Sequence, residues 1–209
     1  MKREPSTKRH LLLAAAVLAP LTATLFFWRA PAQENSAVSI PILNPRFDID
    51  VLSCSPGNLC YPPSGSGITG WICGPETNAQ KMSTVQYPDA PPEGLYVVSI
   101  GYTYATGSIL QTLGATVQAN TTYTLTLNVG ARADVPFTGY LASLGAGNVT
   151  LASGNKVTPV GGTFAREVIV YNSGANPAQL GQPLQIFVKS LGTGQVNISA
   201  VSLTAQPTS

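Results

Sequence analysis

Apolar and polar residues alternate with a period of two along most of the chain after residue 37. In the run Tyr-Thr-Leu-Thr-Leu-Asn-Val at 123–129, every odd-numbered residue is apolar and every even-numbered residue is polar. Such alternation is typical of an antiparallel strand with one buried face and one face in water. Asn120 and Gly130 bracket the run as turn residues. The pattern therefore predicts a strand over 123–129.

Nine further short runs between Gly, Pro and Asn residues predict strands. They cover residues 38–43, 70–73, 95–100, 108–113, 137–144, 148–152, 163–171, 184–189 and 196–205. Helical periodicity is absent from this part of the chain. Short strands at this spacing predict an all-β fold, an antiparallel β-sandwich of the jelly-roll, galactose-binding-like type. In the last run the apolar phase shifts between Ala200 and Val201, which predicts a β-bulge.

Residues 50–92 are rich in Pro, Gly and Ser and contain all three cysteines and Trp71. We expect this long irregular stretch to cover one edge or one mouth of the sandwich, because such passages in compact domains are usually functional or held by crosslinks.

The first 32 residues have the organisation of an export signal. Four Lys and Arg residues and one Glu lie among the first ten, and residues 11–28 carry no charge. This basic segment, the apolar run and Ala30-Pro31-Ala32 predict a signal peptide cut after Ala32. An uncleaved N-terminal anchor is the alternative, because about 20 apolar residues can span a bilayer. We expect a single β-sandwich domain over 33–209, secreted or held in the periplasm or cell envelope, and at a membrane only if the leader is retained.

Removal of the leader changes the charge of the working protein. The whole chain has 11 Lys and Arg and nine Asp and Glu, and cleavage removes five of those bases and one acid, which leaves six against eight and a formal charge of −2. Nucleic-acid binding needs a basic face to replace phosphate counterions, so we exclude a nucleic-acid partner.

The single histidine, His10, lies in the leader. Its loss excludes Ser-His-Asp and Cys-His catalysis and histidine-ligated zinc from the mature domain. Acid or base chemistry must come from a carboxyl, Tyr, Lys or Cys with a shifted pKa.

The three cysteines, Cys54, Cys60 and Cys73, lie close together in the sequence. An exported compartment allows disulfides to persist, and three cysteines allow one bridge and one thiol. We favour Cys54–Cys60, whose intervening loop can double back, with Cys60–Cys73 as the alternative bridge. The remaining thiol at Cys73 is a candidate reactive group.

Several short motifs occur in one order along the chain. They are Ile40-Pro41-Ile42 with Asn44 and Phe47-Asp48, Gly70-Trp71, Pro92-Glu93-Gly94, Gln111-Thr112-Leu113, Thr122-Tyr123-Thr124-Leu125, Asn128-Val129-Gly130 and Leu203-Thr204-Ala205. In these motifs the chain resembles calcium-binding jelly-roll domains related to carbohydrate-binding modules of families 4 and 9. Within that group it is most similar to the exported cyanobacterial cyclases that form hapalindole-type alkaloids.

The resemblance implies structural calcium near the first and last strands, where the family uses an acidic residue after the early Phe. Asp48 occupies that position, and Asn44 and Asp50 lie beside it. Calcium binds six to eight oxygens, including carboxylates, so these three residues are candidate ligands. The alternative is that they are solvated turn residues.

The last strand departs from the cyclase pattern. The cyclases have an acidic pair there, Asp-Phe-Asp-Asn-Val, which supplies a general acid and supports calcium; this chain has Asn197-Ile198-Ser199-Ala200-Val201. An amide or a hydroxyl cannot deliver a proton as a carboxylic acid does. We therefore assign no catalytic residue. Whether the protein is an enzyme stays open, and the sequence favours a protein without enzyme activity.

The favoured function is binding of a small molecule or glycan. Trp71, Tyr96, Tyr102 and Tyr104 are candidate stacking platforms, because aromatic faces pack on the apolar side of sugars. The alternative for Trp71 is a place in the core.

Two other functions remain open. A cyclase-like enzyme could use a different acid, at Glu93 or Asp89. A structural cell-envelope protein is favoured if the leader is kept as an anchor.

Overall fold

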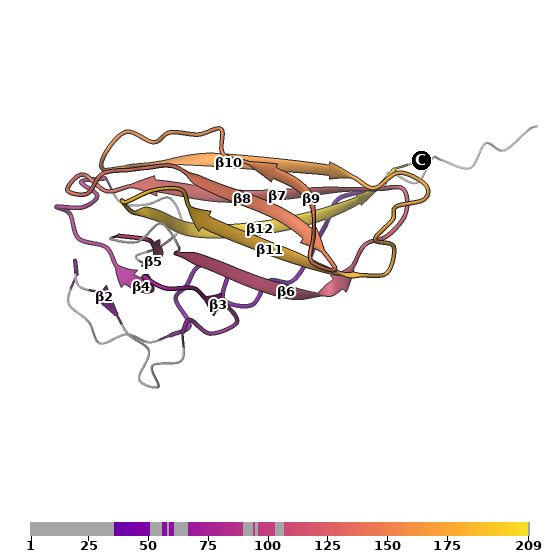
Figure 1. The fold of residues 1–209 in the computed structure, drawn as a ribbon, viewed down its shortest axis with the longest axis horizontal. Helices are drawn as coiled ribbons and strands as arrows, with labels where there is room; N and C mark the ends of the chain where they lie inside the picture. The colour runs from indigo at the N-terminus through magenta and orange to yellow at the C-terminus, as the bar shows by residue number, and fades with distance from the viewer. Residues whose placement is uncertain are drawn as a thin grey trace, which may run out of the picture. The chain divides into compact units, whose positions relative to one another are not determined.

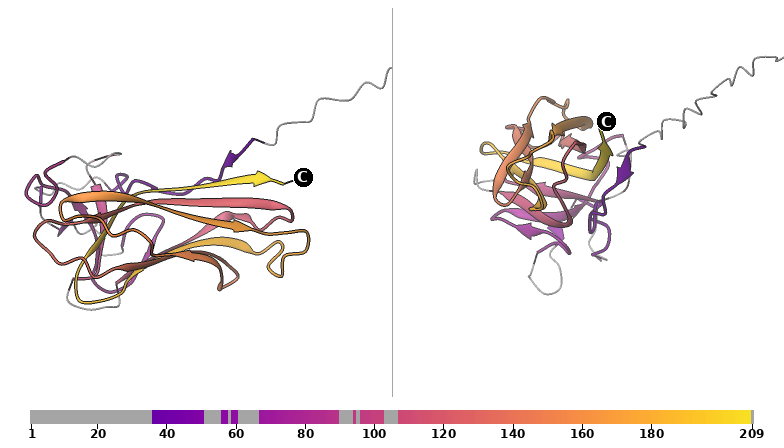
Figure 2. Two further views of the ribbon diagram at one scale, coloured as in Figure 1. Left: turned by 90° about the horizontal axis from the view of Figure 1, so that it is seen from above. Right: turned by 90° about the vertical axis from the view of Figure 1, so that its right-hand side faces the viewer.

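Two antiparallel β-sheets pack face to face in this computed structural model (Figure 1), which describes residues 36–50, 56–57, 59–60, 67–89, 94, 96–102 and 107–208. Within these residues there are twelve strands and no helix. The turned views in Figure 2 show the strands in two layers. Residues Asn35–Ser209 form one compact unit. Among the described residues, no helix has the length and hydropathy that a membrane span requires.

The larger sheet has seven strands in the order β10-β7-β12-β5-β4-β2, with β1 paired to β12. These strands are β10 (Thr163–Asn172), β7 (Thr121–Ala131), β12 (Val196–Pro207), β5 (Tyr96–Ile100), β4 (Thr77–Lys81), β2 (Leu59–Cys60) and β1 (Val38–Ser39). The smaller sheet has five strands in the order β3-β6-β11-β8-β9. They are β3 (Ile72–Cys73), β6 (Ser108–Thr116), β11 (Pro183–Ser190), β8 (Tyr140–Ala146) and β9 (Val149–Gly154).

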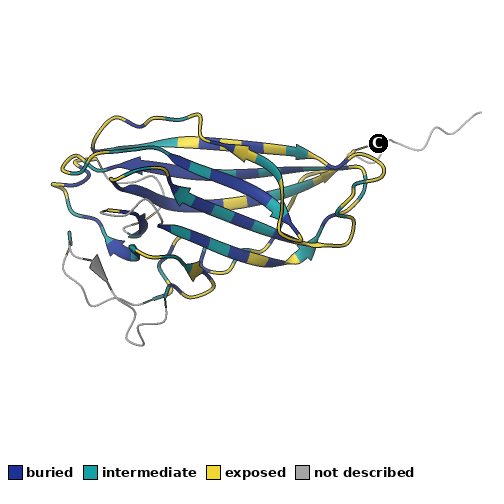
Figure 3. Cartoon of the chain, viewed as in Figure 1, coloured by how far each residue is buried: buried dark blue, intermediate teal, exposed yellow. Residues whose placement is uncertain are grey.

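The core lies between the two sheets, where the alternating apolar residues of both meet (Figure 3). Leu125, Leu127, Leu144, Ile186 and Ile198 are fully buried there. Burial of such a side chain contributes about 1.5–3 kcal/mol, and this is the main reason that period-two sequences assemble as a sandwich.

The predicted fold class is therefore confirmed, and so is the bulge in the last strand. The pairing of β12 with β7 shifts register between Ile198 and Val201. Two strands were not predicted, β2 and β4. The sequence of β4 is Thr-Asn-Ala-Gln-Lys, and Ala79 is its one apolar residue. Its hydrophobic pattern therefore does not predict a strand.

The cysteine prediction is tested only in part. Cys73 is a free thiol, and burial raises its pKa, so the alternative bridge Cys60–Cys73 is not formed. Cys54 and the side chain of Cys60 lie outside the described residues, as does the leader, so the Cys54–Cys60 bridge and cleavage after Ala32 stay predictions.

Candidate functional site

One row of directly opposed residues crosses five strands of the seven-stranded sheet. Phe164 of β10 pairs with Gly130 of β7, which pairs with Asn197 of β12; Asn197 pairs with Ser99 of β5, and Ser99 with Asn78 of β4. Opposed residues in antiparallel strands point to the same face. Their neighbours along each strand lie in the core, so this row lies on the outer face of the sheet.

The outer face is covered at this point by the segment after β4. Tyr87 stacks on Phe164 with ring centroids 4.5 Å apart, and Met82 and Val97 complete a small apolar cluster. As a result Ser99 and Asn197 are 1% and 0% exposed although they lie outside the sandwich core. Side chains that a strand would normally present to water are enclosed here.

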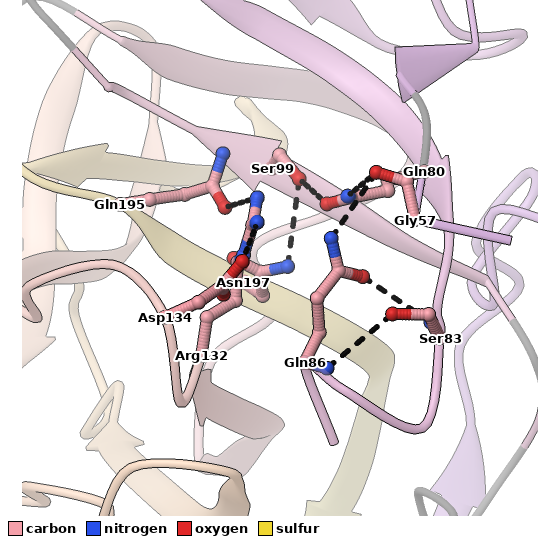
Figure 4. Close-up of polar contacts among 9 residues, drawn as sticks. All are labelled: Gly57, Gln80, Ser83, Gln86, Ser99, Arg132, Asp134, Gln195 and Asn197. Carbon is pink, nitrogen blue, oxygen red and sulfur yellow. Dashed lines mark hydrogen bonds and ion pairs between the residues drawn. The ribbon is translucent and has the colours of Figure 1, made fainter.

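The enclosed polar groups form a chain of hydrogen bonds that runs in one direction (Figure 4). The Gln80 amide nitrogen donates to the carbonyl of Gly57 at 3.2 Å, which turns the Gln80 amide oxygen towards Ser99. The Ser99 hydroxyl donates to that oxygen at 2.7 Å and accepts from the Asn197 amide nitrogen at 3.4 Å. This polarity leaves Asn197 Oδ1 as an acceptor at the end of the chain.

Three buried polar atoms of this region have no hydrogen-bond partner within the described part of the chain: Asn197 Oδ1, Ser199 Oγ and the Tyr87 hydroxyl. The Tyr87 oxygen lies 2.9 Å from the position that a Cβ on Gly130 would take, and Gly130 is the cross-strand neighbour of Asn197. Burial raises the pKa of Tyr87, so its phenol stays protonated. A buried polar group without a partner costs about 1–3 kcal/mol, so such atoms indicate a place where a ligand or water can bind.

A hollow of about 550 Å³ opens next to this network, over β4 and the residues that follow β5, and Gln80 is the side chain of the network that lines it. Its lining includes Gln80, Tyr102, Arg132 and Gln195, together with Glu76, the one carboxylate among the lining residues that the structure describes. Glu76 has a left-handed backbone with φ 49, and its carbonyl accepts the Gly101 N–H at 2.9 Å. A non-glycine residue held in that region is uncommon and often marks a functional segment.

The cation in the hollow is already compensated. Arg132 donates to both carboxylate oxygens of Asp134, at 2.8 and 2.6 Å, and to Gln195 Oε1 at 2.9 Å (Figure 4). These bonds lower the pKa of Asp134, so the pair stays ionised. Arg132 therefore fixes the position of Gln195, and both side chains line the hollow.

The segment over the network is held by Gln86. Its amide nitrogen donates to the same Gly57 carbonyl at 3.2 Å, and its amide oxygen accepts the Ser83 N–H at 3.2 Å. The loop around Gly57 and the segment after β4 are thus joined at one carbonyl.

The structure does not gather the predicted stacking residues in one place. Trp71 is 5% exposed in the core, where it packs on Phe47 with centroids 5.5 Å apart and donates to the Asn44 carbonyl at 3.2 Å. Tyr96 is half-buried against the main core, Tyr102 is exposed and lines the hollow, and Tyr104 lies outside the described residues.

The predicted calcium ligands lie in one turn, and most of their side-chain oxygens have partners within the protein. Asp50 accepts the N–H and the hydroxyl of Thr69, at 3.0 and 2.5 Å, and the Asn44 amide nitrogen at 3.1 Å. Asn44 Oδ1 accepts the Ile49 N–H, and Asp48 pairs with Arg46 at 3.0 Å. Protein donors contact both carboxylate oxygens of Asp50 and Asn44 Oδ1, whereas Asp48 Oδ1 has no partner among the described residues, and structural calcium stays a prediction. Among the described residues, no three His, Cys, Asp or Glu side chains converge.

Of the two alternative acids, Asp89 is exposed and Glu93 lies outside the described residues. The sequence prediction missed Gln80, Ser99, Arg132 and Glu76. No motif identifies them, because they come together only through the pairing of β7, β12, β5 and β4.

Fold and hollow together define an all-β sandwich with a polar hollow and a buried polar network on the outer face of one sheet. The family model described as HpiC1-like, HpiC1 cyclase, matches residues 38–204. The chain belongs to this cyclase family, as the resemblance implied. No curated protein matches it.

Solved cyclase structures support the assignment. An apo cyclase from Fischerella sp. is 26% identical with a TM-score of 0.71, over 83% of this chain and 98% of that one. A Stig cyclase from Fischerella sp. TAU in complex with (3Z)-3-(1-methyl-2-pyrrolidinylidene)-3H-indole is 27% identical with a TM-score of 0.70, over 83% and 100%. A cyclase from the same source in complex with 4-(1H-indol-3-yl)butan-2-one is 27% identical with a TM-score of 0.69, over 82% and 99%. Carbohydrate-binding modules are more distant: one in complex with β-1,4-galactotriose is 12% identical with a TM-score of 0.49, over 78% of this chain and 97% of that one.

Proposed function

We propose that this protein binds a small indole-bearing molecule in the hollow over β4 and in the buried polar network that adjoins it, and catalyses its cyclisation. The observation that carries the proposal is the buried chain from Gln80 to Asn197, which ends in an acceptor without a partner. It lies on the strand where the cyclases have their acidic pair. The ligands named for the Fischerella cyclases are indole compounds.

An indole N–H matches this acceptor. The chain of hydrogen bonds sets Asn197 Oδ1 to accept, so a ligand that presents an N–H removes the cost of the unpartnered oxygen. The buried hydroxyls of Ser199 and Tyr87, which also lack partners among the described residues, can each donate or accept a hydrogen bond. Such a site binds by orientation and by exclusion of water, which are the contributions that a cyclisation requires from a protein.

The acid must differ from that of the cyclases. Neither Asn197 nor Ser199 can donate a proton as a carboxylic acid does. We infer that Glu76, on the wall of the hollow, supplies this function. Its carboxylic acid protonates the substrate, the resulting cation closes the ring through an internal nucleophile, and the cyclised cation returns a proton to the carboxylate. The product is then an isomer of the substrate, and no other reactant is needed.

Calorimetric titration with 4-(1H-indol-3-yl)butan-2-one tests the site. We expect the wild type to bind, and Asn197→Ala to bind at least about fivefold more weakly, because a net hydrogen bond contributes about 1 kcal/mol. The N-methylated indole should bind the wild type about fivefold more weakly than the parent indole does. It should bind Asn197→Ala with the same affinity as the parent indole, because the acceptor is already absent there. Asn172→Ala, an exposed change on the same sheet, is the matched control.

Turnover is tested separately by chromatography and mass spectrometry with a prenylated indole, where the product should have the mass of the substrate. Failure of the wild type to bind, or equal binding by Asn197→Ala, would sink the proposed site. Binding without any isomer would overturn the cyclase activity and leave a binding protein.

A further inference from the structure

A second groove of about 390 Å³ lies on the same outer face, further along β10, β7 and β12 from the row that contains Phe164 and Asn197. It runs over β10, β7 and β12. Arg166 of β10 lies directly opposite Asn128 of β7, and Thr126 of β7 lies opposite Ser202 of β12. Ala200, within the bulge between Ile198 and Val201, lines the groove.

The charged group of the groove is unpaired. The Arg166 side chain has no ion pair or hydrogen bond within the described residues. Its neighbour Glu167 points to the opposite side of the strand, into the core, where it accepts the hydroxyl of Tyr140. No acidic residue lies among the described residues that line the groove. The cation is therefore available to an external anion.

Asn128 adds a second polar group that lacks a partner. It is 9% exposed, and its side-chain amide makes no hydrogen bond with the described residues. A cation and an amide donor on opposed positions, with the hydroxyls of Thr126 and Ser202 beside them, form a set of donors that suits a carboxylate. Phe164, Ala165 and Ala200 supply an apolar surface next to these groups.

We propose that this groove binds a small organic carboxylate, with the carboxylate at Arg166 and Asn128 and an apolar ring or chain against Phe164 and Ala200. The site is separate from the indole hollow and does not depend on cyclase activity. The groove is too large for a bare inorganic anion to fill, and its apolar part favours an acid with a hydrocarbon body.

Titration with benzoate, followed by calorimetry and by NMR shifts of the groove residues, tests the proposal. We expect wild-type binding to weaken at least about tenfold in Arg166→Ala, because hydrogen bonds to a charged group are stronger than neutral ones. It should also weaken as the salt concentration rises. Arg166→Lys should retain part of the affinity, since it keeps the charge but loses the planar fork. Benzyl alcohol should bind wild type and Arg166→Ala equally.

Two controls separate this groove from other parts of the protein. Arg46→Ala removes an exposed arginine far along the chain and should leave benzoate binding unchanged. Asn197→Ala should also leave it unchanged, whatever happens to indole binding. No benzoate binding by the wild type, equal binding by Arg166→Ala, or NMR shifts confined to the Gln80–Ser99 region would each overturn the proposal. Because Arg166 is exposed, its variants should have the same melting temperature as the wild type.

Discussion

Asn197 illustrates how one residue changes the chemistry of the site. It lies where the resemblance places a carboxylic acid, yet its amide can only accept or donate hydrogen bonds. The sequence predicted that the acid is missing, and the structure adds the orientation of the amide through Ser99 and Gln80. A residue read in isolation could not indicate this, because the hydrogen-bond partners come from β4 and β5.

Glu76→Gln tests the proposed acid. General acid catalysis contributes about 10²–10⁴-fold, so we expect kcat to fall by at least about 100-fold. Binding of 4-(1H-indol-3-yl)butan-2-one should change little, because Gln is nearly isosteric with Glu. Asp89→Asn, a change of an exposed carboxylate, should retain wild-type turnover. Unchanged kcat in Glu76→Gln would show that the proton comes from elsewhere.

At the scale of the element, strand periodicity located ten of the strands but did not predict their order in the two sheets. β7 and β12 follow the alternation closely, and the phase shift in β12 was correctly read as a bulge. β4 escaped prediction because its outward residues Asn78 and Gln80 are polar and its core residue Ala79 is small. Its place in the sheet depends on backbone pairing with β5, which no hydrophobic pattern records.

Gly130 is needed in β7 for the cover of the network. A Cβ there would lie 2.5 Å from Phe164 and 2.9 Å from the Tyr87 hydroxyl. We expect Gly130→Ala to lower the free energy of unfolding by about 1–3 kcal/mol, the usual cost of overpacking. Urea denaturation measures it.

Gly114→Ala on β6 is the matched control, because nothing lies within 4 Å of its Cβ position. That variant should be as stable as the wild type or slightly more stable, since alanine restricts the unfolded chain. Equal stability of the two alanine variants would contradict the close packing of Phe164 over β7.

At the scale of the whole molecule, Tyr140 and Glu167 join the two sheets. Tyr140 belongs to β8 and donates its hydroxyl to Glu167 of β10, which also accepts the N–H of Lys156 at 2.8 Å. Burial and the hydrogen bond to Glu167 raise the pKa of Tyr140. The buried carboxylate of β10 thus relies on donors from β8 in the opposite sheet and from the loop after β9.

Tyr140→Phe should therefore lower the free energy of unfolding at neutral pH by about 1–3 kcal/mol, because it removes a donor from a buried carboxylate. The pH dependence follows from the raised pKa. The folded protein holds the phenol proton more tightly than the unfolded chain, so this stabilisation is complete below about pH 10 and declines as the pH rises further.

Denaturant unfolding between pH 7 and 11 checks this prediction. Tyr140→Phe should show a smaller alkaline decline than the wild type, whereas Tyr171→Phe, whose ring stacks on Tyr123, should keep the wild-type profile. A Tyr140→Phe protein with wild-type stability at pH 7 would exclude this contact as a link between the sheets.

By itself, the sequence determined the all-β sandwich, the bulge in the last strand and the loss of the acidic pair at Asn197 and Ser199. The first two follow from side-chain period, which is a local property of the chain, and the third follows from comparing these residues with the cyclases that the chain resembles. Only the tertiary structure decided where the polar residues meet. Strand pairing brought Gln80, Ser99 and Asn197 together on the outer face and placed Trp71 in the core, because register joins residues that are distant in the sequence.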